Sequence, residues 1–327
     1  MAGVLGTAAL WIAAGLGALW TGLAVWHQIA APWRWLALAG LILALILLLR
    51  LNAARPALAW GGLLTAALGV GLWWGSIRPS NQGDWRPEVA RLARVEVEGA
   101  RATIHNLRNF TWRAPNDFDE AWETRSYDLD QLTSADFISS VWGNPAIAHT
   151  FLSFGFADGS RVAFSAEVRR KKGQIFRGVD GAFKRFELAL VAATEEDVIR
   201  LRTHARSEEV SIYPLRVSQE QMRAMFLAYL GLAEELAEKP RFYHTLLTNC
   251  TTEIFRLARI VAPGIPRDWR ILVSGHVADY LHDHGMIDPA RPMAEIRAEA
   301  AINARALAAP PEADFSAAIR APIRGAP

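Results

Sequence analysis

The single cysteine of the chain, Cys250, occupies a position from which a thiol could act as a nucleophile. Thr248 and Asn249 just before it are favourable N-cap residues, and residues 251–260 carry apolar side chains at helical spacing. Cys250 is therefore expected in the first turn of a helix. There the unpaired backbone N–H groups and the positive end of the helix dipole lower a thiol pKa and can hold an oxyanion. The alternative interpretation is a small buried side chain, the usual fate of an unpaired cysteine.

A cysteine nucleophile needs an imidazole as its base and a further polar group that orients the imidazole. Among the eight histidines, His149 stands in a strongly apolar predicted strand, which an Asp158-Gly159 turn connects to a second strand. A three-residue turn would place His149 opposite Glu167, whereas a two-residue turn would place it opposite Val168. The sequence leaves both registers open. A hydrogen-bonded core histidine and a solvated glutamate are the alternative interpretation of this pair.

The sequence gives less support to metal binding and to cofactor-dependent chemistry. A group of histidines and aspartates near the end of the chain fits no standard zinc spacing, and its two aspartates fit a solvated helix face. The group consists of His276, Asp279, His282, Asp283 and His284. The sequence contains no glycine-rich phosphate loop, nucleophile-elbow serine or dinucleotide fingerprint. We therefore expect neither a metal nor an organic cofactor.

Charge divides the 327-residue chain into two parts. Residues 1–78 contain no Asp or Glu and four arginines, Arg34, Arg50, Arg55 and Arg78, whereas the remainder holds all 33 acidic residues. The formal net charge of +2 gives no reason to expect a nucleic-acid partner. The first part is instead typical of a membrane region.

Three apolar runs, about 4–30, 35–50 and 57–77, predict three transmembrane helices. A spanning helix needs about 20 apolar residues, so the shorter middle run leaves two spans as the alternative. The positive-inside rule places Arg50 and Arg55, between the second and third runs, in the cytoplasm. The chain after the third run then lies outside the cytoplasm. We expect a multi-pass protein of the bacterial inner membrane with its catalytic domain in the periplasm.

The soluble part mixes strand and helix signals. A hairpin is expected at residues 94–104, a short helix at 134–142, paired strands at 146–157 and 161–170, and a strand at 186–193. Helices are expected at 195–205, 219–238, 251–260 and 275–284, and an extended segment at 209–215. The division predicted from these signals is a membrane region at 1–78, a catalytic domain at 79–290 and an Ala/Pro-rich tail at 291–327, weakly ordered from about residue 306.

Three motifs together resemble a known family. They are IHNLRNFTWR at residues 104–113, AHTFLSFGF with the following DG turn and EVRR at 148–170, and FYHTLLTNCTT at 242–252. In this order they resemble the Lnb N-terminal periplasmic domain family, over roughly residues 85–288. The resemblance implies an α+β fold, a circularly permuted papain-like domain with a central antiparallel sheet and the catalytic cysteine at a helix N-terminus.

Carried over to this chain, the resemblance implies Cys250 as nucleophile, His149 as base and Glu167 as the orienting residue. We expect backbone N–H groups at the helix start and the Asn249 side chain to hold the oxyanion, with Thr251 and Tyr243 as supporting residues. The implied activity is transfer of an acyl chain from a membrane phospholipid, through a cysteine thioester, to an amine acceptor such as a lipoprotein N-terminus.

Two other functions fit the same residues. A cell-wall peptidase or amidase would use the same Cys–His dyad in a polar groove and would not need several membrane spans. A non-enzymatic membrane scaffold would bury the thiol. An apolar, lipid-sized cleft at Cys250 would favour the acyltransferase over the peptidase.

Overall fold

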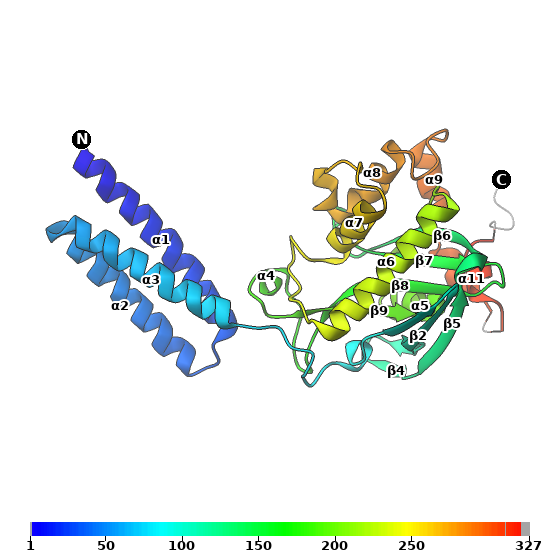
Figure 1. The fold of residues 1–327 in the computed structure, drawn as a ribbon, viewed down its shortest axis with the longest axis horizontal. Coiled ribbons are helices and arrows are strands. Elements are labelled where there is room, and N and C mark those ends of the chain that lie inside the picture. Colours follow the sequence, from blue (N-terminus) through cyan, green and yellow to red (C-terminus); the bar gives the residue numbers. More distant parts are fainter. Residues whose placement is uncertain (1, 311, 322–327) are drawn as a thin grey trace. The chain divides into compact units, whose positions relative to one another are not determined.

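The computed structural model describes residues 2–310 and 312–321 and forms two compact units (Figure 1). The helical unit combines the chain up to Ser80 with Phe176–Phe186 and Phe242–Thr245. The sheet unit combines Asn81–Ile175, Glu187–Arg241 and the chain from Leu246 on. Two short loops of the predicted catalytic domain therefore pack with the N-terminal helices, and the units do not follow the contiguous division expected from the sequence.

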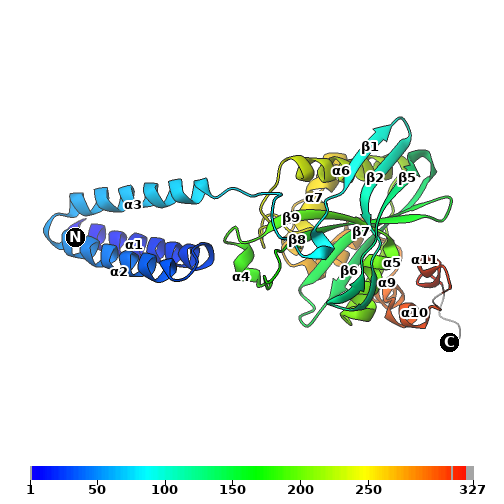
Figure 2. The ribbon, with the colours of Figure 1, turned by 90° about the horizontal axis from the view of Figure 1, so that it is seen from below.

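The helical unit contains three long apolar helices, α1 (Ala2–Gln28), α2 (Trp33–Ala54) and α3 (Pro56–Ser76). Each is long and apolar enough to cross a bilayer. The expected middle run of 35–50 is longer than predicted, because the helix continues past Arg50 to Ala54. Neighbouring helices run side by side, and a single residue, Arg55, separates α2 from α3 (Figure 2).

The loop at Phe176–Phe186, which includes the short helix α4 (Gly178–Gly181), packs on the ends of α1 and α3. The Gln28 side chain donates to the Phe183 and Lys184 carbonyls at 2.5 and 3.0 Å. The Lys184 ammonium donates to the carbonyl of Trp74 at 2.6 Å. Phe183 is buried and contacts the rings of Trp20 and Trp74. The helical unit is thus held together by specific contacts as well as by apolar packing.

The second loop, Phe242–Thr245, joins the helical unit through the first. The Tyr243 amide donates to the Phe186 carbonyl at 3.0 Å, and the Thr245 hydroxyl donates to the Gly178 carbonyl at 2.5 Å. Gly181 permits this close packing, because a Cβ there would lie within 2.4 Å of the Thr245 hydroxyl oxygen.

Within the described residues, eight strands of the sheet unit form one sheet, seven of them in the order β1-β2-β9-β8-β7-β6-β10, with β5 paired to β2. The strands are β1 (Arg94–Glu98), β2 (Arg101–Arg108), β5 (Trp122–Asp128), β6 (Leu132–Val141), β7 (Ala148–Phe156), β8 (Arg161–Arg169), β9 (Glu187–Ala193) and β10 (Glu209–Pro214). All pairs are antiparallel except β2 and β9, which meet in parallel at Arg108 and Ala193. The fold is therefore α+β, and the expected central antiparallel sheet is a mixed sheet because of this one parallel pair.

The predicted short helix at 134–142 is wrong, because these residues form the buried strand β6. Ser134 looks like an N-cap in the sequence. In the fold, however, Ile138 pairs with Phe151 of β7 on one side and with Ile212 of β10 on the other. Pairing on both edges, together with burial of Phe137 and Ile138, outweighs the local capping signal.

Helices cover both faces of the sheet (Figure 2). On one face α6 (Gln219–Glu238), begun by a Ser218 capping box, packs Phe226 and Tyr229 against Phe154 and Phe164. The same face carries α7 (Cys250–Val261), which contacts β7 and β8. The opposite face is covered by α5 (Glu195–Arg200), α10 (Asn303–Ala308) and α11 (Phe315–Ala318).

The remaining elements are short. They are the hairpin β3 (Thr111–Ala114) and β4 (Asp117–Asp119), the π-helical turn Leu201–Ala205, the 3₁₀ turns η1 (Pro87–Val89), η2 (Leu129–Gln131), η4 (Trp269–Ile271) and η5 (Ser274–His276), and the helices α8 (Val277–Asp283) and α9 (Met293–Ala300).

The C-terminal segment, expected to be weakly ordered, contributes to the core instead. Ile302, Ala306, Phe315 and Ile319 are all buried and join the cluster around Phe151. An alanine- and proline-rich composition hides this packing, because the few apolar residues that are buried are spaced one helical turn apart, in or next to two short helices. Residue 311 and residues 322–327 of the expected tail lie outside the described part of the chain.

Candidate active site

Cys250 is the first residue of α7, one position earlier than the predicted helix start. A reciprocal capping box fixes this end of the helix. The Asn249 side-chain oxygen accepts from the Thr252 amide at 2.9 Å, and the Thr252 hydroxyl oxygen accepts from the Asn249 amide at 2.8 Å. The thiol is free and partly exposed. The cysteine thus stands where the helix dipole favours a thiolate.

The hairpin of β7 and β8 adopts the three-residue turn, one of the two registers left open by the sequence. The Phe156 amide donates to the Ser160 carbonyl at 3.0 Å, and the paired register runs from Gly155–Arg161 to Leu152–Phe164. Continued along both strands, this register sets His149 opposite Glu167. Their side chains do meet, with 3.2 Å between His149 Nε2 and Glu167 Oε1.

Ser165, which sequence analysis did not select, completes this contact. Its hydroxyl donates to Glu167 Oε1 at 2.8 Å, and His149 Nε2 lies 2.7 Å from its oxygen. Because the single hydroxyl proton goes to the carboxylate, Ser165 accepts from Nε2–H. The other ring nitrogen, Nδ1, is then left for the thiol. Alternation along the strand was the available signal, since Ser165 and Glu167 share a face two residues apart.

Electrostatics couple the thiol and the imidazole. Burial raises the pKa of the Cys250 thiol, but the charge of His149 and the hydrogen bond between the two side chains lower it to about 7. Burial and the Arg202 charge lower the pKa of His149, but Glu167 and the Cys250 thiolate raise it to about 9. Each group favours the charged form of the other, which is the property of a thiolate–imidazolium pair.

A second residue without a sequence signal, Arg202, lies behind Glu167. Its guanidinium donates to Glu167 Oε1 at 3.0 Å and to Glu208 Oε2 at 3.1 Å, and Ser140 donates to the same Glu208 oxygen at 2.5 Å. Although burial raises the pKa of Glu167, the neighbouring His149 and Arg202 hold it well below its usual value. Arg202 therefore favours the charged form of the Glu167 carboxylate and holds it in place.

The predicted supporting residues have different surroundings. The buried Thr251 hydroxyl lies 2.9 Å from the Thr150 hydroxyl of β7 and 3.9 Å from the Cys250 sulfur, so it joins the helix to the strand that carries His149. Asn249 is the N-cap of α7. Tyr243 belongs to the helical unit, where its ring contacts Phe176. Oxyanion roles for Asn249 and Tyr243 stay predictions.

Five exposed apolar side chains belong to segments that adjoin His149 or Cys250 in the sequence or pack beside the start of β7, and we refer to them as the apolar rim. The rim consists of Ile147, Leu246, Leu247, Trp269 and Leu272, all more than half exposed. Ile147 and Leu247 stand two and three residues before His149 and Cys250 respectively. Trp269 and Leu272 lie beside η5, which is tied to the start of β7 because the Ala148 amide donates to the Ser274 hydroxyl at 2.8 Å. An apolar substrate would find matching surface here.

Both aspartates of the group considered for a metal are engaged in ion pairs with arginines. Asp283 accepts from Arg270 at 2.6 Å, and Asp279 pairs with Arg297. Among the described residues, no group of three or more His, Cys, Asp or Glu side chains is placed to hold a metal ion.

Comparison with known proteins adds one finding. Residues 118–275 match the family model of the Lnb N-terminal periplasmic domain. The matched stretch includes His149, Ser165, Glu167, Arg202 and Cys250. No curated protein and no solved structure matches the chain.

Proposed function

We propose that this protein, whose residues 118–275 match the Lnb N-terminal periplasmic domain family model, is a membrane-anchored cysteine acyltransferase. The observation that carries the proposal is the line of contacts from Arg202 through Glu167 and His149 to Cys250. The order of these groups, with histidine and glutamate on adjacent strands and cysteine at a following helix start, supports a permuted papain-like fold.

In the first half-reaction, the Cys250 thiolate attacks the carbonyl carbon of a phospholipid ester. A C–S bond forms and the ester C–O bond breaks. The departing lysophospholipid oxygen takes a proton from the His149 imidazolium, which leaves a thioester and a neutral imidazole. Glu167 stabilises the imidazolium before this transfer, because its carboxylate lies 3.2 Å from Nε2.

In the second half-reaction, an amine attacks the thioester carbonyl. A C–N bond forms, the C–S bond breaks and His149 takes the proton lost by the amine, which regenerates the thiolate–imidazolium pair. Backbone N–H groups in the first turn of α7, together with the Asn249 side chain, are the proposed donors to the oxyanion in both steps. We take a lipoprotein N-terminus as the acceptor on the basis of the family.

Two features support a lipid as the acyl donor. The apolar rim includes Ile147 and Leu247, which stand close in sequence to His149 and Cys250, and three apolar helices precede the domain. A diacyl lipid does not readily leave a bilayer, so an enzyme that consumes it benefits from a membrane anchor. We place the protein in the inner membrane with several spans and the sheet unit in the periplasm, in keeping with the periplasmic family.

Intact-mass analysis tests the proposal. The purified full-length protein is incubated with phospholipid in the absence of an amine, and the expected product carries one fatty acyl group on Cys250 that neutral hydroxylamine removes. His149→Ala and Cys250→Ala should lack this adduct, whereas His105→Ala, which changes a histidine on β2, should keep it.

Two outcomes would contradict the proposal. Release of peptidoglycan stem peptides without an acyl adduct would identify a peptidase or amidase that uses the same dyad. Failure of Cys250 to react with a thiol probe in the folded protein at neutral pH would exclude a nucleophile altogether.

A further inference from the structure

The helical unit carries an unbalanced positive charge at one end. The basic residues at this end, which we name the basic collar, are Arg34, Arg78, Arg177, Lys184 and Arg185. Asp180 is the single acidic residue in the sequence of this unit, and it lies 3.3 Å from His27. Arg50 and Arg55 lie at the opposite end of α2. Five cations therefore gather near one carboxylate that is already paired.

Several contacts place the collar at the ends of α1 and α3. Arg185 donates to the His27 carbonyl at 2.9 Å, and Arg34 donates to the Ile29 carbonyl at 2.9 Å. Lys184 donates to the Trp74 carbonyl at 2.6 Å. Arg78 directly follows Ile77, whose carbonyl also accepts from Lys184 at 3.3 Å. The Arg177 carbonyl accepts from the amide of Asp180 at 2.9 Å, and Asp180 is the residue that pairs with His27. The collar is thus one cluster at one level along the helices.

Tryptophans mark this level as the membrane interface. Trp20 and Trp74 lie 5.0 Å apart, and Trp26 and Trp35 lie 5.6 Å apart. Trp33 and Trp73 belong to the same end of the helices. Tryptophan side chains concentrate at the headgroup level of bilayers. Basic residues at the headgroup level of a bilayer lie beside the lipid phosphates.

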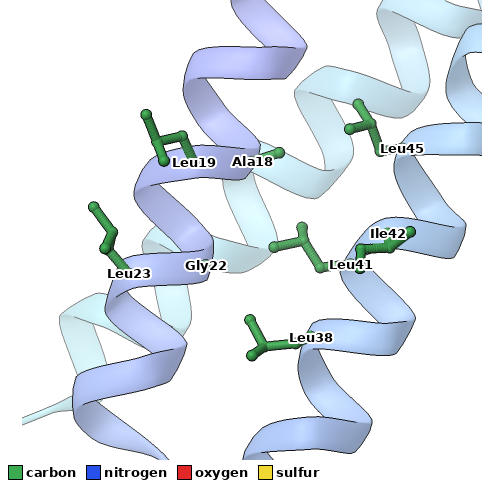
Figure 3. A pocket seen from close by; sticks show the side chains of 8 residues that line it. All are labelled: Ala18, Leu19, Gly22, Leu23, Leu38, Leu41, Ile42 and Leu45. Carbon is green, nitrogen blue, oxygen red and sulfur yellow. The ribbon is translucent and has the colours of Figure 1, made fainter.

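An apolar groove runs between α1 and α2 (Figure 3). Its volume is about 330 Å³, and Gly22 opens its wall opposite Leu38 and Leu41. Gly22 stands six residues before the end of α1, which is about 9 Å at 1.5 Å per residue. The groove therefore begins at the depth of the upper acyl chain of a lipid whose phosphate lies at the collar.

We propose that the basic collar and this groove bind one anionic phospholipid, with the headgroup phosphate among the cations and an acyl chain against Gly22. Arg78 and Arg177 are exposed and have no ion-pair partner among the described residues, so their charges are open to a ligand. A zwitterionic lipid brings an ammonium group among five cations and binds less well. This binding is independent of acyl transfer at Cys250.

Tryptophan quenching tests the proposal in the full-length protein. The detergent-purified protein is titrated with phosphatidylglycerol that carries brominated acyl chains, and then with the matching brominated phosphatidylethanolamine. The expected result is saturable quenching with at least tenfold higher affinity for phosphatidylglycerol. Inorganic phosphate alone should not displace the lipid, since it lacks the chain; displacement by phosphate would indicate a site for a free anion instead.

Matched variants locate the site. Arg78→Gln/Arg177→Gln should weaken phosphatidylglycerol binding about tenfold or more, because each basic residue near an anionic lipid contributes about a fivefold effect. Arg101→Gln/Arg267→Gln removes two exposed charges from the sheet unit and should leave the affinity unchanged. Gly22→Leu fills the groove and should weaken binding of both lipids. Equal affinities for the two lipids, or equal behaviour of the two double variants, would overturn the proposal.

Discussion

The sheet unit contains two buried arginine–carboxylate clusters, which differ in whether every partner of the carboxylate is a permanent hydrogen-bond donor. In the first, Asp197 accepts from Arg108 through both carboxylate oxygens at 2.9 Å, from the Phe110 amide at 2.8 Å and from the Trp112 indole at 2.8 Å. Neither Arg108 nor Asp197 has an appreciably exposed side chain. Every partner is a permanent donor, so the charge of this cluster is fixed and its role is to hold β2, β3 and α5 together.

In the second cluster, the carboxylate of Glu167 shares one oxygen among Arg202, Ser165 and His149. Its last member is an imidazole whose protonation depends on the Cys250 thiol. The two clusters are alike in pairing a buried arginine with a carboxylate. They differ in that the second has, at one end, a partner that can exchange a proton.

The largest expected effect is the loss of acyl transfer when Cys250, at the end of the second cluster, is replaced. Cys250→Ala should lower acyl transfer to an amine reporter by about 10⁴-fold or more, since no other thiol exists in the chain. The thermal midpoint should stay close to that of the wild type, because the side chain is small and partly exposed. Substantial residual transfer would assign the nucleophile to another residue.

A substitution in the first cluster should instead lower stability and leave the reactivity of Cys250 unchanged. Asp197→Ala leaves Arg108 buried without its carboxylate and should lower the free energy of unfolding by about 3–5 kcal/mol. Thermal unfolding measures this loss, and Asp119→Ala, which opens an exposed pair with Arg113, is the control with no expected change. The rate of Cys250 alkylation below the transition should not change. A slower alkylation would show that the two clusters are coupled.

Glu167→Gln should replace the carboxylate of the second cluster with a neutral amide and so weaken the coupling between His149 and Cys250. Loss of the carboxylate lowers the pKa of His149 from about 9, and the pKa of Cys250 then rises from about 7. We expect about a 100-fold loss of acyl transfer with little loss of stability. The thiolate absorbance near 240 nm, followed against pH, reports the shift. An unchanged titration would remove Glu167 from the orienting role.

The pH dependence should also separate the two clusters. As pH falls below about 7 the Cys250 thiolate is protonated, and as pH rises above about 9 the His149 imidazolium loses its proton. Acyl transfer should therefore peak between these values and fall about tenfold per pH unit on the acid side. In His149→Ala, alkylation should instead rise once, toward the higher pKa of an ordinary thiol. A single rise in the wild type would argue against the coupled pair.

The smallest effect is expected from Ser165. Ser165→Ala removes the hydroxyl that links His149 to Glu167 but leaves the direct 3.2 Å contact between the two side chains. Acyl transfer should fall about threefold to tenfold with the same pH optimum. Ser153→Ala removes a comparable hydroxyl that donates to Glu195 away from the dyad and should leave the rate unchanged.

Local patterns were sufficient for much of the site. The N-cap residues predicted the helix that begins at Cys250, and the Asp158-Gly159 turn predicted the hairpin that carries His149 and Glu167. The choice between the two registers was not available from sequence, because both turns fit the same residues. The apolar lengths of α1, α2 and α3 were also evident, since a composition without acidic residues needs no tertiary information.

What sequence reasoning missed depends on contacts between distant segments. Arg202 reaches Glu167 across 35 residues from a π-helical turn, and no local pattern marks it. Strand β6 was mistaken for a helix because its pairing with β7 and β10 lies outside any local window. The C-terminal helices were not predicted because Phe315 and Ile319 are buried only by packing against a sheet face built from distant parts of the chain.

The discontinuous helical unit has a consequence for dissecting the protein. A fragment that starts after Ser80 would retain Phe176–Phe186 and Phe242–Thr245 but lose the helices on which they fold. Phe183 would lose the aromatic surface of Trp20 and Trp74, and Lys184 would lose its carbonyl acceptors. The second orphaned loop ends five residues before Cys250. The N-terminal helices thus supply the packing surface for a loop that leads to Cys250, and an unrelated set of helices would not supply it.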